Sequence, residues 1–196
     1  LLLRTYAVQA GDTILVHAAA GGMGLILCQW AKALGAKVVG TVSTHEKAEV
    51  ARAAGCHYPV VRSEQNFVDV VREVTDGEGC AVVYEAIGKD TLQHSLDSLR
   101  PMGVCAAYGH VSGPPDPVDI IQDLGRRGSL FITRPAIMHY VAKRADLEWT
   151  ARDLFKAIGD GLLEANINYE YALKDAVKAH EAIESGKTLG ATVLIP

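Results

Sequence analysis

The chain has 196 residues, of which 49% are hydrophobic and 21% are charged, and its net charge at pH 7 is −4. These values are typical of a folded protein of one or two domains, and they exclude both a bulk basic field that attracts nucleic acid and an apolar run long enough to span a membrane. The sequence begins without a methionine, so we expect it to be a piece of a longer protein.

The first predicted elements are a strand, a turn of small residues and a helix. The apolar run Thr13–Val16 predicts a buried strand, and the apolar spacing of residues 25–34 predicts a helix that ends at Gly35. Residues 18–24 between them read AAAGGMG, an imperfect G-x-G-x-x-G in which an alanine takes the first position. Such a turn lets a pyrophosphate approach free N–H groups at a helix N-terminus. The alternative is a turn that only packs the helix against a sheet.

The second predicted strand, Lys37–Val42, bears on the choice of dinucleotide. A site for NAD usually places an acid at the end of this strand, where it binds the ribose 2′-hydroxyl. Here Ser43, Thr44 and Lys47 follow the strand instead, so we expect NADP(H), whose 2′-phosphate the lysine would attract. Glu46 fits as a solvent-facing acid in the first turn of a helix. Lys47 could equally be an ordinary surface lysine.

The remaining pattern alternates strands and helices, which predicts an α/β protein with a doubly wound parallel sheet. We expect strands at residues 58–61, 80–84, 104–108 and 129–133, helices at 46–54, 66–74 and 91–99, and turns at 76–79 and 100–103. Ligands of such sheets bind beyond the carboxyl ends of the strands. The candidate ends are residues 18–24, 85–88 and 108–112. In the last of these, His110 and Ser112 could contact a nicotinamide or ribose, or could serve ordinary turn chemistry.

The pattern becomes irregular after about Gly161. We expect a helix at 147–159, which is followed by residues 169–173 (YEYAL), a helix at 174–183 and a final strand, Ala191–Ile195. The four cysteines (Cys28, Cys56, Cys80 and Cys105) lack metal-ligand spacing, which predicts buried, reduced thiols, no metal site and a cytoplasmic location.

Several of these segments together resemble one family over essentially the whole chain. They are residues 11–24, the helix end at 31–36, the strand and turn at 129–135, and the final residues 190–196. They are similar to the NADPH:quinone oxidoreductase branch of the medium-chain dehydrogenases/reductases, which includes zeta-crystallin. The resemblance implies a Rossmann cofactor domain at residues 1–163. It also implies a segment at 164–196 that returns to a GroES-like catalytic domain, whose N-terminal part is missing here.

The resemblance also implies a mechanism. Members bind NADPH without zinc and pass a hydride directly to a quinone or enone, so the protein must align donor and acceptor and no catalytic side chain is predicted. We expect this chain alone to bind cofactor but to turn over poorly. The edge strand at residues 130–133 would pair in a homodimer.

The cofactor-binding residues that the resemblance implies fall into four groups. Gly21, Gly22, Met23 and Gly24 would meet the pyrophosphate. Ser43, Lys47 and Arg62 would surround the 2′-phosphate. Ile87, Tyr108 and His110 would line the ribose and nicotinamide side, and Phe131 and Thr133 would close the pocket. Arg62 departs from the tyrosine often found there, but its planar fork suits a phosphate. Lys187 stands where some members have an arginine near the cofactor.

Two other functions remain open from the sequence. One is a different reaction of the same superfamily, such as that of an enoyl reductase or an alcohol dehydrogenase. The other is a non-enzymatic role like those of zeta-crystallin relatives, which serve as lens protein or bind RNA. The sequence shows no basic stripe interleaved with aromatic residues, so nucleic-acid binding is not favoured.

Overall fold

A six-stranded parallel sheet forms the centre of the computed structural model, which describes residues 1–196. The strand order is β3-β2-β1-β4-β5-β6. The strands are β1 (Thr13–Val16), β2 (Lys37–Val42), β3 (Tyr58–Val61), β4 (Cys80–Glu85), β5 (Leu99–Ala107) and β6 (Phe131–Thr133). The chain reverses its direction of winding between β1 and β4, so a crevice is expected at the carboxyl ends of these two strands. The predicted doubly wound parallel sheet is confirmed.

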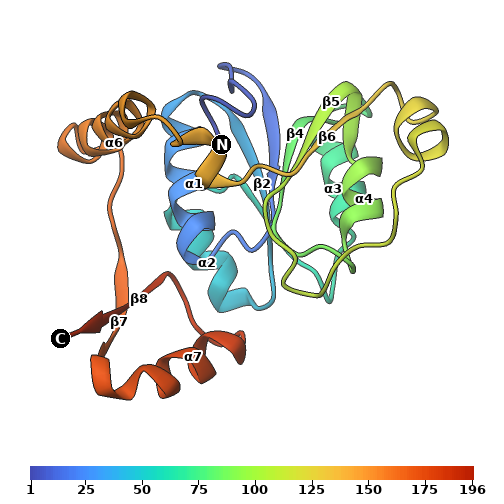
Figure 1. Cartoon of the computed structure of the whole chain (residues 1–196). Coiled ribbons are helices and arrows are strands. Elements are labelled where there is room, and N and C mark those ends of the chain that lie inside the picture. The colour runs from blue at the N-terminus through green and yellow to red at the C-terminus, as the bar shows by residue number, and fades with distance from the viewer.

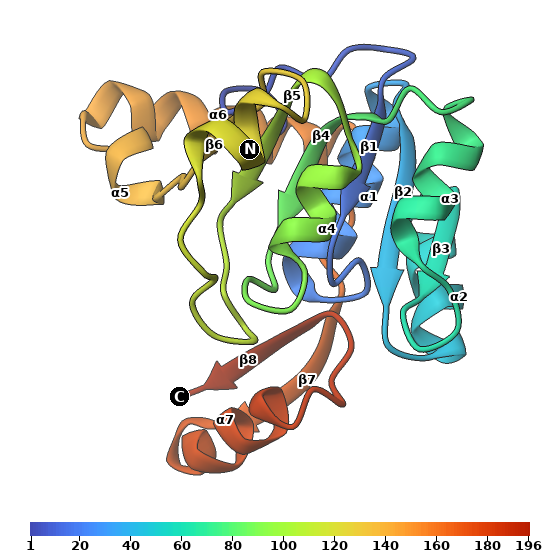
Figure 2. The same ribbon diagram turned by 90° about the vertical axis from the view of Figure 1, so that its right-hand side faces the viewer.

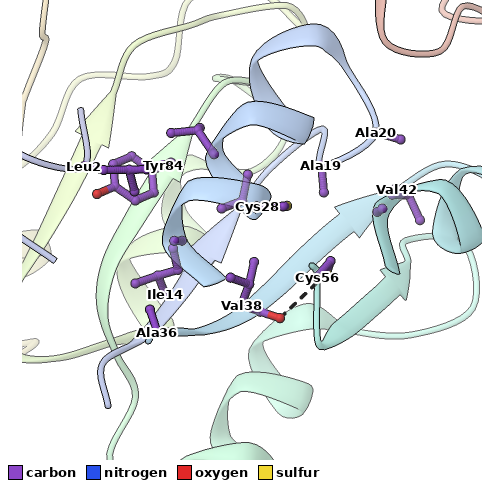
Figure 3. Packing of buried hydrophobic residues seen from close by; sticks show 14 of the residues in the cluster. Leu2, Ile14, Ala19, Ala20, Cys28, Ala36, Val38, Val42, Cys56 and Tyr84 are labelled. Atoms are coloured by element: carbon purple, nitrogen blue, oxygen red, sulfur yellow. Dashed lines mark hydrogen bonds between the residues drawn. The ribbon is translucent and has the colours of Figure 1, made fainter. Parts of the chain in front are cut away.

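Helices cover both faces of this sheet, as Figure 1 shows. The helices α1 (Gly22–Ala33) and α2 (His45–Ala53) lie on one face, and α3 (Phe67–Val74) and α4 (Leu92–Asp97) lie on the other. Because successive side chains of a strand point to opposite faces, neighbouring residues of β1 enter different clusters. Ile14 packs with Val38 and α1 (Figure 3), while Leu15 packs with Val39 and α3.

The predicted turn at residues 100–103 is wrong, because these residues lie inside β5. Leu99 already pairs with Cys80, and after an irregularity the ladder resumes with Val104 opposite Val82. Met102 takes a left-handed conformation with φ 60°, and its N–H donates to the carbonyl of Gly128. The strand therefore absorbs the proline and glycine as a bulge. The preceding helix ends at Asp97 rather than at residue 99, since Leu99 belongs to the ladder.

The segment after β5 contains elements that the sequence pattern did not predict. A π-helical turn (Ile120–Gly125) begins at Asp119, whose carboxylate accepts from the N–H groups of Ile121 and Gln122. A short helix α5 (Ile137–Tyr140) follows β6, and α6 (Arg144–Gly159) begins three residues before the predicted start. Both short elements expose most of their apolar residues, among them Ile120, Ile121, Ile137 and Met138, so no helical periodicity marks them.

The C-terminal residues form a small unit of their own. The strands β7 (Ile167–Ala172) and β8 (Ala191–Ile195) pair in parallel, joined by a 3-10 turn (Leu173–Asp175) and α7 (Ala176–Glu184). Figure 2 shows this unit beneath the ends toward which β2 and β4 point. The N–H of Gly190 donates to the carbonyl of Ala20 at 3.0 Å, which ties the unit to the turn after β1. The predicted boundary at 163/164 falls between α6 and β7 and stays a prediction. None of the helices is both long and apolar enough to cross a membrane.

Candidate cofactor site

A cavity of about 500 Å³ opens at the carboxyl ends of β1, β2 and β3, beside the turn that follows β4. The C-terminal unit supplies part of its wall. The lining residues are Ala18, Ala20, Gly21, Thr41, Val42, Ser43, Lys47, Arg62, Ile87, Ser185, Gly186 and Thr188. This wall includes two cationic side chains and no carboxylate. The cavity is therefore suited to an anionic ligand.

The turn after β1 is built as tightly as its small residues allow. Ala18 has φ 52°, and the N–H of Gly21 donates to its carbonyl at 2.9 Å. A Cβ at Gly24 would lie 2.2 Å from that carbonyl oxygen, so only glycine lets α1 approach the turn this closely. The turn therefore does pack the helix α1 against the sheet, as the alternative interpretation of the sequence predicts. It does not exclude a ligand, because packing and binding use different atoms of the turn.

The N-terminus of α1 offers unused hydrogen-bond donors. Gly21 is the N-cap and supplies no side chain, and the N–H groups of Met23 and Gly24 have no acceptor within the chain. The N–H of Gly22 instead faces the carbonyl of Gly190, as part of the parallel bridge between Gly21 and Gly190. The first turn of α1 contains no acid. Free N–H groups and the helix dipole together favour an anion at this position. The backbone here fits a pyrophosphate.

The two hydroxyl residues after β2, Ser43 and Thr44, have different roles in the structure. The hydroxyl of Thr44 accepts from the N–H of Lys47 and so caps α2, whereas Ser43 lines the cavity. Glu46 is exposed in the first turn of α2 and is absent from the cavity wall. The side chain of Arg62, just after β3, forms neither an ion pair nor a hydrogen bond with the protein. Its charge is available to a phosphate.

The structure brings some of the predicted site residues together and leaves others apart. Gly21, Ser43, Lys47, Arg62 and Ile87 share the cavity wall. The side chain of Met23 instead lines a separate apolar cavity of about 230 Å³, together with residues 1–3 and Trp30. Four predicted residues lie on or beyond β5 and β6, outside the wall of the larger cavity: Tyr108, His110, Phe131 and Thr133.

The loop after β5 packs against the turn after β4. The hydroxyl of Ser112 donates to the carbonyl of Ile87 at 2.9 Å and accepts from the N–H of Asp90 at 3.1 Å. Its turn role is therefore the one observed. Nδ1 of His110 lies 3.4 Å from the guanidinium of Arg134. Gly88 has φ 93°, and a Cβ there would lie 2.6 Å from the carbonyl oxygen of Gly113, so the two loops hold each other in place.

A buried polar cluster lies next to the cavity, and the sequence analysis did not single it out. It joins His17 at the end of β1, Thr41 of β2, Glu85 at the end of β4, and Thr91 and Ser95 at the start of α4 and within it. All five side chains are buried. The signal available in the sequence was an acid at the end of an otherwise apolar strand, opposite a histidine at the end of another.

The charge state of this cluster follows from its surroundings. Burial lowers the pKa of His17. The negative charge of Glu85 acts in the opposite direction but is the smaller effect, so the imidazole stays neutral. Burial opposes ionisation of Glu85, but hydrogen bonds that the carboxylate accepts from Ser95 and from the N–H groups of Ile87 and Gly88 favour the charged form and outweigh it. The pKa of Glu85 therefore lies below its ordinary value. Burial and the charge of Glu85 also raise the pKa of Tyr108.

The cavity residues Ser185 and Thr188 were not predicted. They flank Gly186 and Lys187 in the segment between α7 and β8, where the resemblance to the family places Gly186-Lys187 near the cofactor. Lys187 is exposed, and its N–H donates to the hydroxyl of Ser185. Nothing in the local sequence indicates that this segment reaches back to the end of β2, more than 100 residues earlier.

The chain's residues do not gather into a metal-binding group. No three His, Cys, Asp or Glu side chains lie together, and the four cysteines are free and buried, as expected. The donor set of these 196 residues does not fit a zinc site.

Comparison with known proteins places the chain in a family. Residues 22–148 match the family described as zinc-binding dehydrogenase. The chain is 53% identical over 196 residues to a 2-haloacrylate reductase of Burkholderia sp. and 44% identical over 198 residues to a quinone oxidoreductase of Salmonella typhimurium. These matches cover 100% of this chain and 59% and 60% of the relatives, so the chain spans about 60% of the length of the relatives it matches.

A solved structure agrees in fold and contains a dinucleotide. The crystal structure of Escherichia coli quinone oxidoreductase complexed with NADPH matches with a TM-score of 0.94 and 41% identity. The match covers 100% of this chain and 60% of that one. The chain therefore belongs to the zinc-binding dehydrogenase family.

Proposed function

We propose that the protein is an NADPH-dependent reductase, zinc-independent, and that this chain supplies its cofactor-binding half. The observation that carries the proposal is the acid-free cavity in which Lys47 and Arg62 stand beside the free N–H groups of α1. The E. coli structure complexed with NADPH and a mycobacterial structure complexed with NADPH, 42% identical with a TM-score of 0.95, support the choice of cofactor.

The residues of the chain then have distinct tasks. The free N–H groups of Met23 and Gly24 hold the pyrophosphate, and Lys47 and Arg62 neutralise the 2′-phosphate. Ile87 forms an apolar wall beside the nicotinamide ribose and excludes water there. The bound nicotinamide supplies a hydride to the substrate. Direct hydride transfer needs close alignment of donor and acceptor and no nucleophile. No side chain of this chain therefore has to act as a nucleophile, an acid or a base.

We propose a quinone as the substrate, with a 2-haloacrylate as the second candidate. Two relatives that are 44% identical are quinone oxidoreductases, whereas the 53% identical relative is a 2-haloacrylate reductase. Both substrates offer a carbon or oxygen atom that is electron-poor through conjugation and can therefore accept a hydride. An alcohol substrate would require the opposite direction of transfer.

The test is the rate of NADPH oxidation by the protein expressed at the full length of its gene. It should be measured with a panel of simple quinones, with 2-chloroacrylate, with an enone and with primary alcohols plus NADP⁺. Turnover with quinones and little with the others supports the first candidate, and a preference for 2-chloroacrylate supports the second. Efficient alcohol oxidation, or no turnover with any acceptor although NADPH binds, would refute the proposed reductase.

The assembly is a separate proposal. The strand β6 lies at the edge of the sheet, where its outer backbone groups are free to pair with another strand. We propose that two copies pair through residues 130–133. The cytoplasmic location stays a prediction.

A further inference from the structure

The buried cluster of His17, Thr41, Glu85, Thr91 and Ser95 adjoins three parts of the cavity wall. His17 directly precedes Ala18, Thr41 itself lines the cavity, and Glu85 stands two residues before Ile87. The three residues come from β1, β2 and β4, which are neighbours in the sheet. The cluster therefore reaches the cavity wall at three places, of which Glu85 itself holds only the turn that carries Ile87.

The carboxylate of Glu85 is the centre of the cluster. Oε1 accepts from the N–H groups of Ile87 at 2.6 Å and Gly88 at 3.1 Å, and Oε2 accepts from the hydroxyl of Ser95 at 2.5 Å. The hydroxyl of Thr91 lies 2.9 Å from both oxygens. Four donors thus converge on one buried carboxylate. Two of them are the backbone of the turn that carries Ile87 into the cavity.

In the hydrogen bonds that continue from Glu85 to Ser95, His17 and Thr41, each group donates toward the carboxylate. Because Ser95 donates to Glu85, its oxygen accepts from Nε2–H of His17, at 2.9 Å. Nδ1 of His17 then accepts from the hydroxyl of Thr41, also at 2.9 Å. This order requires a neutral imidazole, which agrees with its burial. The chain of bonds runs from the cavity wall at Thr41 to the turn at Ile87.

A cluster of this kind is a poor choice for stability alone. Taking a carboxylate out of water is costly, and apolar residues of similar volume often serve as well or better. The advantage of the cluster is precise positioning, because directional hydrogen bonds restrict the conformation of a backbone turn more than apolar contacts do. The turn that is held here needs such restraint: Gly88 is left-handed, and its neighbours leave no room for a side chain.

We propose that Glu85 is a positioning residue, which fixes the Ile87–Gly88 turn and so shapes the part of the cavity that receives the nicotinamide half of the cofactor. The inference rests on the proposed function, since it assumes a dinucleotide in the cavity. The opposite part of the wall, with Ser43, Lys47 and Arg62, forms no hydrogen bond or ion pair with Glu85. The phosphate-binding part should therefore be unaffected by changes at Glu85.

The experiment compares two ligands on the same variants. NADPH carries both halves of the dinucleotide, whereas 2′,5′-ADP carries the 2′-phosphate and lacks the nicotinamide. Glu85→Gln keeps the shape of the side chain but removes its charge and turns one acceptor into a donor. We expect Glu85→Gln to weaken NADPH binding about tenfold and to change 2′,5′-ADP binding by less than about twofold, measured by calorimetry. Ser98→Ala removes a buried hydroxyl that donates only to the carbonyl of His94, so it should change neither ligand.

A second variant covers the case in which Glu85→Gln does not fold. Thr91→Val removes one donor to the carboxylate and keeps the side-chain volume. We expect about a threefold loss of NADPH affinity with 2′,5′-ADP unchanged. If a folded Glu85→Gln or Thr91→Val binds NADPH as the wild type does, or loses both ligands equally, Glu85 is not a positioning residue. If the wild type itself binds neither ligand, the proposed function fails instead.

Discussion

Nζ of Lys47 donates a hydrogen bond to the carbonyl of Gly186 at 2.6 Å, across 139 residues of sequence. The bond connects the first turn of α2 with the segment between α7 and β8. It holds one of the two cations of the cavity in place and at the same time makes the C-terminal unit part of the cavity wall. A bound 2′-phosphate would lie beside this pair.

Removal of the C-terminal unit should therefore weaken cofactor binding. A chain that ends at residue 163 loses Ser185, Gly186 and Thr188 from the wall, as well as the bond from Gly190 to Ala20. We expect about a tenfold weaker Kd for NADPH, since two hydrogen bonds and part of the enclosure are lost. Calorimetry on both lengths measures it. Equal affinity would mean that the unit only lies near the site.

A methyl group at Gly24 should destabilise the fold. In Gly24→Ala the Cβ would meet the carbonyl of Ala18 and force α1 away from the turn. We expect a loss of about 1–3 kcal/mol in the free energy of unfolding, measured by urea denaturation. Gly159→Ala is the matched control, because that position is helical and has nothing within 4 Å of an added Cβ. If both variants unfold alike, the turn is looser than described.

The buried pair should make the protein less stable in acid. The folded state keeps His17 neutral, so below the ordinary pKa of 6.5 the unfolded state takes up the additional proton and folding is disfavoured. The stability contributed by Glu85 is present above its ordinary pKa of 4.5 and is lost as the pH falls through its lower folded value.

Two variants separate these effects. His17→Gln should reduce the fall in stability between pH 6.5 and 4.5 by up to about 1.4 kcal/mol per pH unit. Glu85→Gln should reduce the fall below that range and leave part of the slope within it. Urea denaturation at a series of pH values measures both. An unchanged slope in His17→Gln would show that another group carries the acid sensitivity.

The proposed dimer depends on one edge of the sheet. Phe131 on β6 is 56% exposed, and Phe131→Lys would place a charge on the pairing strand. We expect a shift from dimer to monomer in sedimentation velocity. Tyr58→Lys on β3, the opposite edge, should leave the dimer intact. A wild-type monomer would refute the pairing outright.

The features that could be predicted from the sequence are those that consecutive residues determine. The strand, small-residue turn and helix around Gly21, and the strand end without an acid before Lys47, are read from consecutive residues. The cluster of His17, Thr41 and Glu85 could not be predicted in this way, because its members meet only when β2, β1 and β4 lie side by side. The same holds for Ser185 and Thr188, which reach the cavity from the C-terminal unit. The bulge at Met102 was missed because a Pro and a Gly indicate a turn regardless of the neighbouring ladder.

The central claim is that the cavity recognises a 2′-phosphate through Lys47 and Arg62. Its most direct test is calorimetric titration of the chain with NADPH and with NADH, in the wild type, Lys47→Ala and Arg62→Ala. We predict tighter binding of NADPH by the wild type, with each substitution weakening NADPH about tenfold and leaving NADH nearly unchanged. Equal binding of the two dinucleotides by the wild type, or a loss of both in the variants, would contradict the account.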